Sequence, residues 1–180
     1  MSQNTDFLPF ARPQLGIEEE EAVLRIMRSG WLTTGSETLA FEKEFAEFVG
    51  AKTALAVNSA TSGLHLALEA VGVKPGDTVI TSPYTFASSA AVVRHLGAEV
   101  LFCDTAQDSY NIDPVALERV LKKSGKVRAI VVVHIGGLPC DMDAILTLAR
   151  MYGCAVVEDA AHAFPSLTDK GYAGTLGDIG

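Results

Sequence analysis

From Ala51 onward, short valine-rich apolar runs alternate with segments of helical spacing, and this alternation restricts the possible folds more than any other feature. The runs are apolar on both faces, which is typical of strands that are covered by helices on either side. Buried strands in regular succession with helices favour a parallel sheet. The sequence therefore predicts an α/β fold with a mostly parallel sheet flanked by helices. The expected strands are 53–57, 78–81, 98–103, 128–133 and 154–158, and the expected helices between them are 61–71, 86–96, 114–123 and 140–152.

Two further helices are expected before this unit, at 17–28 and 36–49, separated by "SGWLTTG". Neither an internal repeat nor a low-complexity linker interrupts the chain. The simplest division is an N-terminal arm with helices at 1–50 and a large domain at 51–180.

The amino-acid composition argues against some classes of binding partner. The 180 residues are 48% hydrophobic and carry a formal net charge of -8, which argues against nucleic acid or an anionic membrane as the main partner. The N-terminus does not resemble a secretory signal, and no apolar run is long enough to span a bilayer, so we expect a cytoplasmic protein. Three cysteines without close paired spacing indicate reduced thiols in or near the core: Cys103, Cys140 and Cys154.

The stretch "VVEDAAHAF", Val156 to Phe164, ends an expected strand in two adjacent carboxylates, with a histidine three residues further on. Acidic residues commonly end a buried strand simply because the chain meets water there. In parallel sheets, however, ligands collect at the carboxyl ends of the strands. Asp159 could stabilise a protonated heterocyclic nitrogen there, and His162 could bond a neighbouring oxygen. Side chains alternate along a strand, so Glu158 should point the opposite way.

Two other strand-to-helix junctions are candidate binding segments. In "AVNSATSGLHLAL", the start of the expected helix offers free backbone N–H groups to a phosphate, although an ordinary Ser/Thr helix cap explains the same residues equally well. No lysine follows the glycine, so this is not a Walker motif. In "SPYTFASSAA", Phe86 could face a planar ligand or pack in the core.

A metal site and a hydrolase triad are alternative interpretations. Neither shows the expected signature, because the chain has no tight ligand spacing such as H-E-x-x-H and no G-x-S-x-G segment. The possible metal ligands would be Asp104, His134, Asp141, Asp143, Asp159 and His162.

Seven segments together are specific: "SGWLTTG", "FEKEFAEFVGAK", "NSATSGLHLALEAVGVKPGDTVITSPYTFASSA", "GAEVLFCD", "VVHIGGLPCDMDAI", "VVEDAAHAF" and "GTLGDIG". In this order and spacing the chain resembles the DegT/DnrJ/EryC1/StrS aminotransferases, from about Phe10 to Gly180. The resemblance implies the large domain of a fold type I transferase that depends on pyridoxal 5'-phosphate. It also implies a place in polysaccharide biosynthesis, with a nucleotide-linked keto sugar as substrate, an amino acid such as glutamate as donor, and a homodimer.

The resemblance also assigns roles to individual residues. Asp159 would pair with the pyridinium nitrogen of the cofactor, His162 would bond its 3-oxygen and Phe86 would stack on its ring. Ala60 and Thr61 would bind the phosphate through backbone N–H groups and the threonine hydroxyl. The other polar residues would be structural: Glu158 in the strand, and His134 and Asp141 in the loop above the sheet. The chain has Ile135 where the family often has tyrosine.

One element of the resemblance is missing. The family follows "GTLGDIG" with a strand and the lysine that forms a Schiff base with the cofactor, and this sequence contains neither. We therefore expect no catalytic residue in the chain, and an inactive fragment of the large domain that stops before the lysine-bearing strand. Two alternatives stay open: a non-catalytic module that pairs with a full-length homologue, and a fragment of a sugar dehydratase that uses the same cofactor. The lysines present are Lys43, Lys52, Lys74, Lys122, Lys123, Lys126 and Lys170.

Overall fold

The computed structural model describes residues 12–180, which belong to two compact units, one ending at Phe41 and one spanning Glu42–Gly180. Residues 1–11, which belong to the predicted arm, lie outside the described residues. In the first unit, helix α1 (Ile17–Ser29) begins where the Glu19 carboxylate accepts the Gly16 N–H. It ends at Gly30, whose φ of 73° favours glycine. Helix α2 (Ser36–Val49) crosses the boundary between the units, so the division after residue 50 stays a prediction.

The second unit contains a sheet of four parallel strands in the order β2-β1-β3-β4. Every pairing in this sheet is parallel, which confirms the expected α/β fold. In register, Val133 of β3 lies beside Asp159 of β4, so the carboxyl ends of these strands meet at one edge. The strands are β1 (Thr78–Thr81), β2 (Glu99–Phe102), β3 (Val127–Val133) and β4 (Ala155–Asp159).

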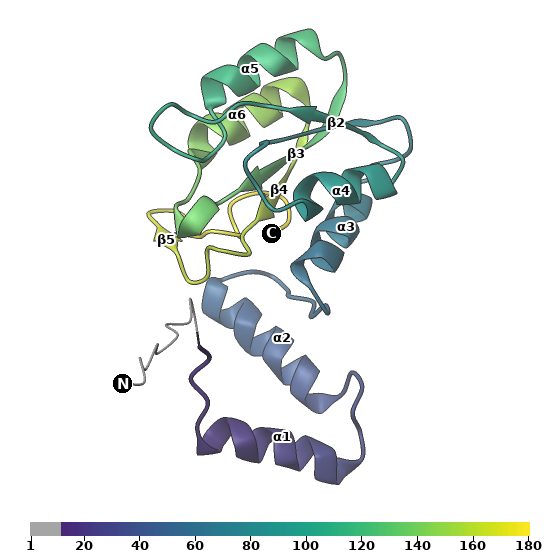
Figure 1. Cartoon of the computed structure of the whole chain (residues 1–180), viewed down its shortest axis with the longest axis vertical. Coiled ribbons are helices and arrows are strands. Elements are labelled where there is room, and N and C mark those ends of the chain that lie inside the picture. The colour runs from purple at the N-terminus through teal and green to yellow at the C-terminus, as the bar shows by residue number, and fades with distance from the viewer. Residues whose placement is uncertain (1–11) are drawn as a thin grey trace, which may run out of the picture. The chain divides into compact units, whose positions relative to one another are not determined.

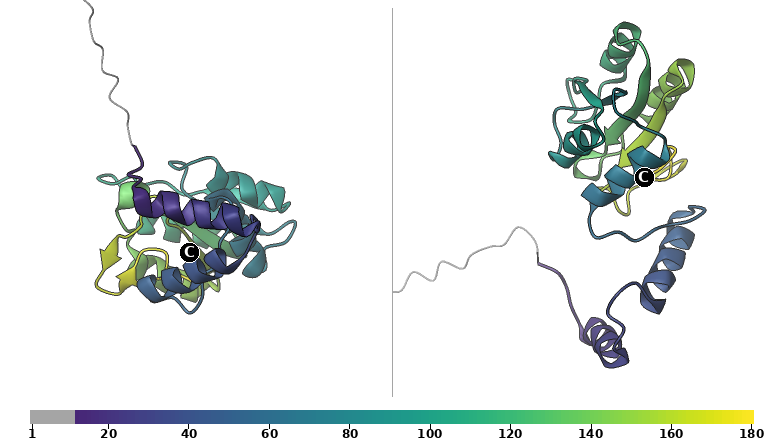
Figure 2. Two further views of the ribbon diagram at one scale, coloured as in Figure 1. Left: turned by 90° about the horizontal axis from the view of Figure 1, so that it is seen from below. Right: turned by 90° about the vertical axis from the view of Figure 1, so that its right-hand side faces the viewer.

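Helices cover both faces of this sheet (Figure 1, Figure 2). On one face, α3 (Ala60–Ala70) and α4 (Ser88–His95) pack against alternate strand residues, which are Val79, Ala129, Val131 and Val157. On the other face, α5 (Pro114–Lys123) and α6 (Met142–Tyr152) pack against the intervening residues, which are Ile80, Ile130, Val132 and Val156. Two apolar clusters therefore explain why these strands are apolar on both sides.

The expected strand at 53–57 is wrong, because no strand forms there. The segment has an apolar pattern, but a strand also needs a neighbour that supplies ladder hydrogen bonds. Within residues 12–180 no strand pairs with it, and the Ala56 N–H donates instead to the Glu42 carboxylate at 2.8 Å. Most of its side chains are accordingly exposed, with Leu55 at 74%.

The chain after β4 folds back on the same unit. A short antiparallel hairpin joins β5 (Leu167–Thr168) to β6 (Gly171–Tyr172). Phe48 of α2 contacts the rings of Phe164 and Tyr172. Further on, Ile179 forms a parallel bridge with Val157 of β4. Among the described helices, none combines the length and the apolar character that crossing a membrane requires.

Candidate functional site

A cavity of about 180 Å³ lies at the carboxyl ends of β3 and β4, next to the first turn of α3. Its wall contains all five residues that the sequence predicts for a binding site, which are Ala60, Thr61, Phe86, Asp159 and His162. The wall also contains Ile135, which the sequence singles out as a departure from the family. Sequence reasoning missed the other four lining residues, which are Thr85, Ser88, Val133 and Ala161. The structure therefore gathers residues that follow β1, β3 and β4 and residues from the starts of α3 and α4 around one cavity.

The first turn of α3 presents two unpaired backbone donors to this cavity. Ser59 caps the helix: its hydroxyl accepts the Ser62 N–H at 3.2 Å, and its carbonyl accepts the Gly63 N–H at 3.0 Å. Within the part of the chain that the structure describes, the N–H groups of Ala60 and Thr61 have no partner. Free N–H groups at the positive end of a helix dipole form a site for an anion.

Phe86 is 74% exposed, although a large aromatic ring normally gains stability from burial. It follows β1 in the bend before α4 and lines the cavity together with its neighbour Thr85. Of the two roles that the sequence left open, the structure excludes a core aromatic. An uncovered ring beside a cavity can instead face a planar ligand.

Asp159 is the last residue of β4 and also lines the cavity. In contrast to the exposed Phe86, it is largely buried, with 7% of its surface exposed. One carboxylate oxygen lies 2.8 Å from the Ser89 hydroxyl, and the other accepts the Ala161 N–H at 3.3 Å. A carboxylate held in a largely buried position can pair strongly with a cationic group of a ligand.

His162 lies three residues beyond, is exposed, and lines the same cavity. Its carbonyl oxygen lies close to the turn Ile135–Gly137 that follows β3. Gly137 has a φ of 84°, and a Cβ there would lie 3.1 Å from the His162 carbonyl oxygen. Glycine is needed at this position both for the backbone angle and for the close approach.

Glu158 points away from the cavity, as strand alternation predicts. It is paired in register with Val132, which faces α5 and α6. One of its oxygens lies 2.8 Å from Nε2 of His134, and Nδ1 of His134 accepts the Cys140 N–H at 3.0 Å. Because Nδ1 accepts, Nε2 carries the hydrogen and donates it to Glu158. His134 thus braces the loop above the sheet, and Asp141 caps α6 by accepting the Ala144 N–H.

Glu158 also anchors the segment that follows the hairpin, since its carboxylate accepts the backbone N–H groups of Gly174, Leu176 and Gly177. Burial opposes ionisation of this carboxyl. The hydrogen bonds from His134 and from the backbone outweigh burial and hold the pKa of Glu158 below its ordinary value.

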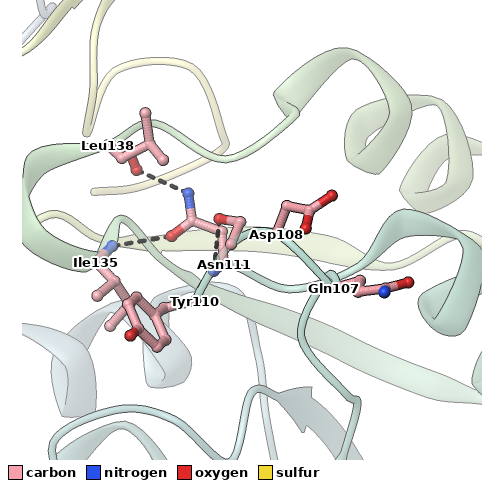
Figure 3. Close-up of a pocket in the computed structure, with 7 residues that line it drawn as sticks. Gln107, Asp108, Tyr110, Asn111, Ile135 and Leu138 are labelled. Atoms are coloured by element: carbon pink, nitrogen blue, oxygen red, sulfur yellow. Dashed lines mark hydrogen bonds between the residues drawn. The ribbon is translucent and has the colours of Figure 1, made fainter.

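A second cavity, of about 290 Å³, shares Ile135 with the first and is shown in Figure 3. The Asn111 side chain links three of its lining residues: its oxygen accepts the Ile135 N–H at 3.1 Å, and its amide donates to the Leu138 carbonyl at 2.8 Å. Tyr110, another lining residue, stacks its ring on Tyr84 with centroids 4.6 Å apart. Asn111 therefore holds the turn that contributes Ile135 to both cavities.

The remaining candidates lie elsewhere. Among residues 12–180, no group of three histidine, cysteine or acidic side chains is placed to hold a metal ion. Burial raises the pKa of the Cys103 and Cys140 thiols to about 12, so both stay protonated at neutral pH. Lys170 is exposed and pairs with Asp143, and it does not line the first cavity.

Comparison with known proteins gives consistent matches. The model of the DegT/DnrJ/EryC1/StrS aminotransferase family matches residues 13–180. The chain is 48% identical over 178 residues to the spore coat polysaccharide biosynthesis protein SpsC of Bacillus subtilis, covering 99% of this chain and 45% of SpsC. It therefore spans less than half the length of this relative.

Solved structures of aminotransferases share the fold. The aminotransferase from Psychrobacter cryohalolentis superposes with a TM-score of 0.86 at 38% identity, over 94% of this chain and 43% of that one. The PMP form of Spr1654 from Streptococcus pneumoniae superposes with a TM-score of 0.89 at 28% identity, over 95% of this chain and 46% of that one.

Proposed function

Because the chain belongs to the DegT/DnrJ/EryC1/StrS aminotransferase family, we propose that its first cavity binds pyridoxal phosphate as part of a sugar aminotransferase. The complete protein would move an amino group from an amino acid, with glutamate as donor, to a nucleotide-linked keto sugar, and would act as a homodimer. The observation that carries the proposal is the convergence of five predicted residues on one cavity. The likeness to SpsC and to a structure in its PMP form supports it.

The phosphate end of the site fits the first turn of α3. Ala60 and Thr61 offer two N–H groups that the helix itself leaves unpaired, because Ser59 takes up the next two. The Thr61 hydroxyl adds a third donor, since it has no hydrogen-bond partner among the described residues and lines the cavity. Three donors and the helix dipole suit a dianionic phosphate.

The ring end of the site fits the opposite wall. Phe86 supplies an exposed aromatic face, and Asp159 supplies a carboxylate that would pair with a protonated ring nitrogen. His162 would donate a hydrogen bond to the oxygen on the ring. When bound, pyridoxal phosphate supplies an electron-withdrawing ring through which an amino group can be transferred.

Transamination also needs an amine that carries protons between carbon atoms. None of the residues that line the first cavity is a lysine. We therefore propose that these 180 residues bind the cofactor without completing the reaction.

The test is a fluorescence titration of the 180-residue chain with pyridoxamine phosphate and with unphosphorylated pyridoxamine. We expect saturable binding of the phosphorylated compound and at least about tenfold weaker binding of the other, because charge-assisted hydrogen bonds to the phosphate are lost. The chain should produce no 2-oxoglutarate from glutamate when a nucleotide-linked keto sugar is supplied. Equal affinity for both compounds would contradict the assigned phosphate site, and formation of 2-oxoglutarate would contradict the need for an added lysine.

A further inference from the structure

Ser89 in the first turn of α4 contacts the Asp159 carboxylate from a fully buried position. Its side chain has no exposed surface, and its Oγ lies 2.8 Å from Oδ2 of Asp159, which is 70 residues away in sequence. Ser89 does not line the cavity, whereas Asp159 does. The hydroxyl therefore approaches the carboxylate from behind, on the side away from the ligand space.

The Asp159 carboxylate determines which hydroxyl donates in each hydrogen bond of this group. An ionised carboxylate can only accept, so the Ser89 hydroxyl donates its single hydrogen to Asp159. The lone pairs of Ser89 then accept the hydrogen of the Thr85 hydroxyl, whose Oγ1 lies 2.7 Å away. The Phe86 carbonyl is a poorer acceptor for Ser89, because it lies at 3.3 Å.

This chain of hydrogen bonds joins two walls of the cavity. Thr85 lies directly before Phe86 in the bend, while Asp159 belongs to β4. The other oxygen of Asp159 has only the longer 3.3 Å contact with the Ala161 N–H. Among the described residues, Ser89 therefore makes the shorter of the two hydrogen bonds that orient this carboxylate.

We infer that Ser89 is a positioning residue: with Thr85 it fixes the Asp159 carboxylate toward the ring nitrogen of the cofactor and ties it to the bend that carries Phe86. The inference rests on the proposed function, since Asp159 is given its role there. Ser89 acts through Asp159, so its contribution to binding should disappear when Asp159 is removed.

A double-mutant cycle tests this dependence, with the dissociation constant of pyridoxamine phosphate measured by fluorescence titration. The four proteins are the native chain, Ser89→Ala, Asp159→Ala and the double variant. We expect Ser89→Ala to raise the dissociation constant by about tenfold in the native chain, because a hydrogen bond to a charged group is lost. In the Asp159→Ala background the same change should have less than about a twofold effect, because no carboxylate is left to orient.

Two variants separate this role from a merely structural one. Ser89→Cys keeps the volume of the buried side chain but has a weak donor, so it should fold like the native chain and bind as poorly as Ser89→Ala. Ser124→Ala removes a comparable hydroxyl bond, to the Val120 carbonyl at the end of α5, and should leave binding unchanged. Full binding by Ser89→Cys would show that volume matters, and would overturn the inference.

The outcomes distinguish this inference from the proposed function. If Asp159→Ala weakens binding while Ser89→Ala does not, the positioning role is wrong and the cofactor site stands. Equal effects of Ser89→Ala in both backgrounds also overturn the positioning role. If Asp159→Ala binds as tightly as the native chain, the proposed cofactor site is wrong, and the positioning role is wrong with it.

Discussion

Glu158 and His134 are fully buried and joined by a 2.8 Å hydrogen bond between a carboxylate oxygen and Nε2. Glu158 is adjacent in sequence to Asp159, yet the two carboxylates face opposite sides of β4. One anchors the loop above the sheet and the segment 174–177, and the other faces the cavity. Because side chains alternate along a strand, Glu158 has a structural position and Asp159 faces the cavity.

The stability of the fold should depend on the ionisation of Glu158. Its pKa in the folded chain lies below the ordinary value of 4.5, so the unfolded chain takes up the proton first. The stabilisation is complete above pH 4.5 and is lost as the pH falls through the lowered pKa. In urea unfolding at several pH values, the free energy of unfolding of the native chain should fall below pH 4.5. The Glu158→Gln variant should lack this loss.

The matched control for Glu158 is Glu118→Gln, which changes a glutamate on α5 that pairs with Lys122 at the surface. At neutral pH we expect Glu158→Gln to cost about 1–3 kcal/mol, because buried donors lose an acceptor, and Glu118→Gln to cost less than about 1 kcal/mol. The same acid dependence in both glutamine variants would show that Glu158 does not carry it.

Ala60→Pro should weaken cofactor binding without unfolding α3. Ala60 is the first residue of the helix, where proline is well accepted, and the preceding Ser59 is already extended. The change removes one N–H that we assign to the phosphate, so the dissociation constant of pyridoxamine phosphate should rise by about tenfold. Ile17→Pro at the first residue of α1 is the control and should bind normally.

Phe86→Ala should weaken the binding of pyridoxamine phosphate and leave the free energy of unfolding nearly unchanged. A buried phenylalanine costs about 3–5 kcal/mol when cut to alanine, whereas the exposed Phe86 ring should cost less than about 1 kcal/mol. Affinity for pyridoxamine phosphate should nevertheless fall several-fold, because the ring loses its stacking partner. A large loss of unfolding free energy with unchanged affinity would assign Phe86 to packing.

Asn111→Ala should destabilise the turn at Ile135–Leu138, which contributes Ile135 to both cavities. The Ile135 N–H and the Leu138 carbonyl would both lose their partner, at a cost of about 1–3 kcal/mol. Gln107→Ala, which changes an exposed residue of the same cavity, should cost less than about 0.5 kcal/mol. Urea unfolding of both variants measures the difference. Equal free energies of unfolding for the two variants would contradict the stabilising role of Asn111.

Much of the site could be predicted because strand ends are visible in the sequence. The apolar run before Asp159 identified β4, and the order of the strands brought that residue to the same edge as Phe86 and the start of α3. Ser89 could not be found in this way. A serine in a first helical turn is typical of a cap, and only the packing of α4 against the sheet shows that its hydroxyl meets Asp159.

The error at 53–57 has a different cause. Apolar periodicity reports which side chains can be buried, but it does not report whether a neighbouring strand is available. Val57 and Leu55 fit a strand by composition, and within the described residues no pairing partner lies beside them. The sequence pattern therefore predicts only a local preference for a strand. Whether a strand forms depends on hydrogen bonds to a neighbouring strand.

The measurement that tests the central claim most directly is the dissociation constant of pyridoxamine phosphate for the native chain and for Asp159→Asn. The substitution keeps the shape of the side chain and an acceptor for Ser89, but it removes the charge that would pair with the ring nitrogen. The cofactor assignment predicts saturable binding by the native chain and at least about tenfold weaker binding by the variant. Equal affinity of the two proteins, or no binding by the native chain, would contradict it.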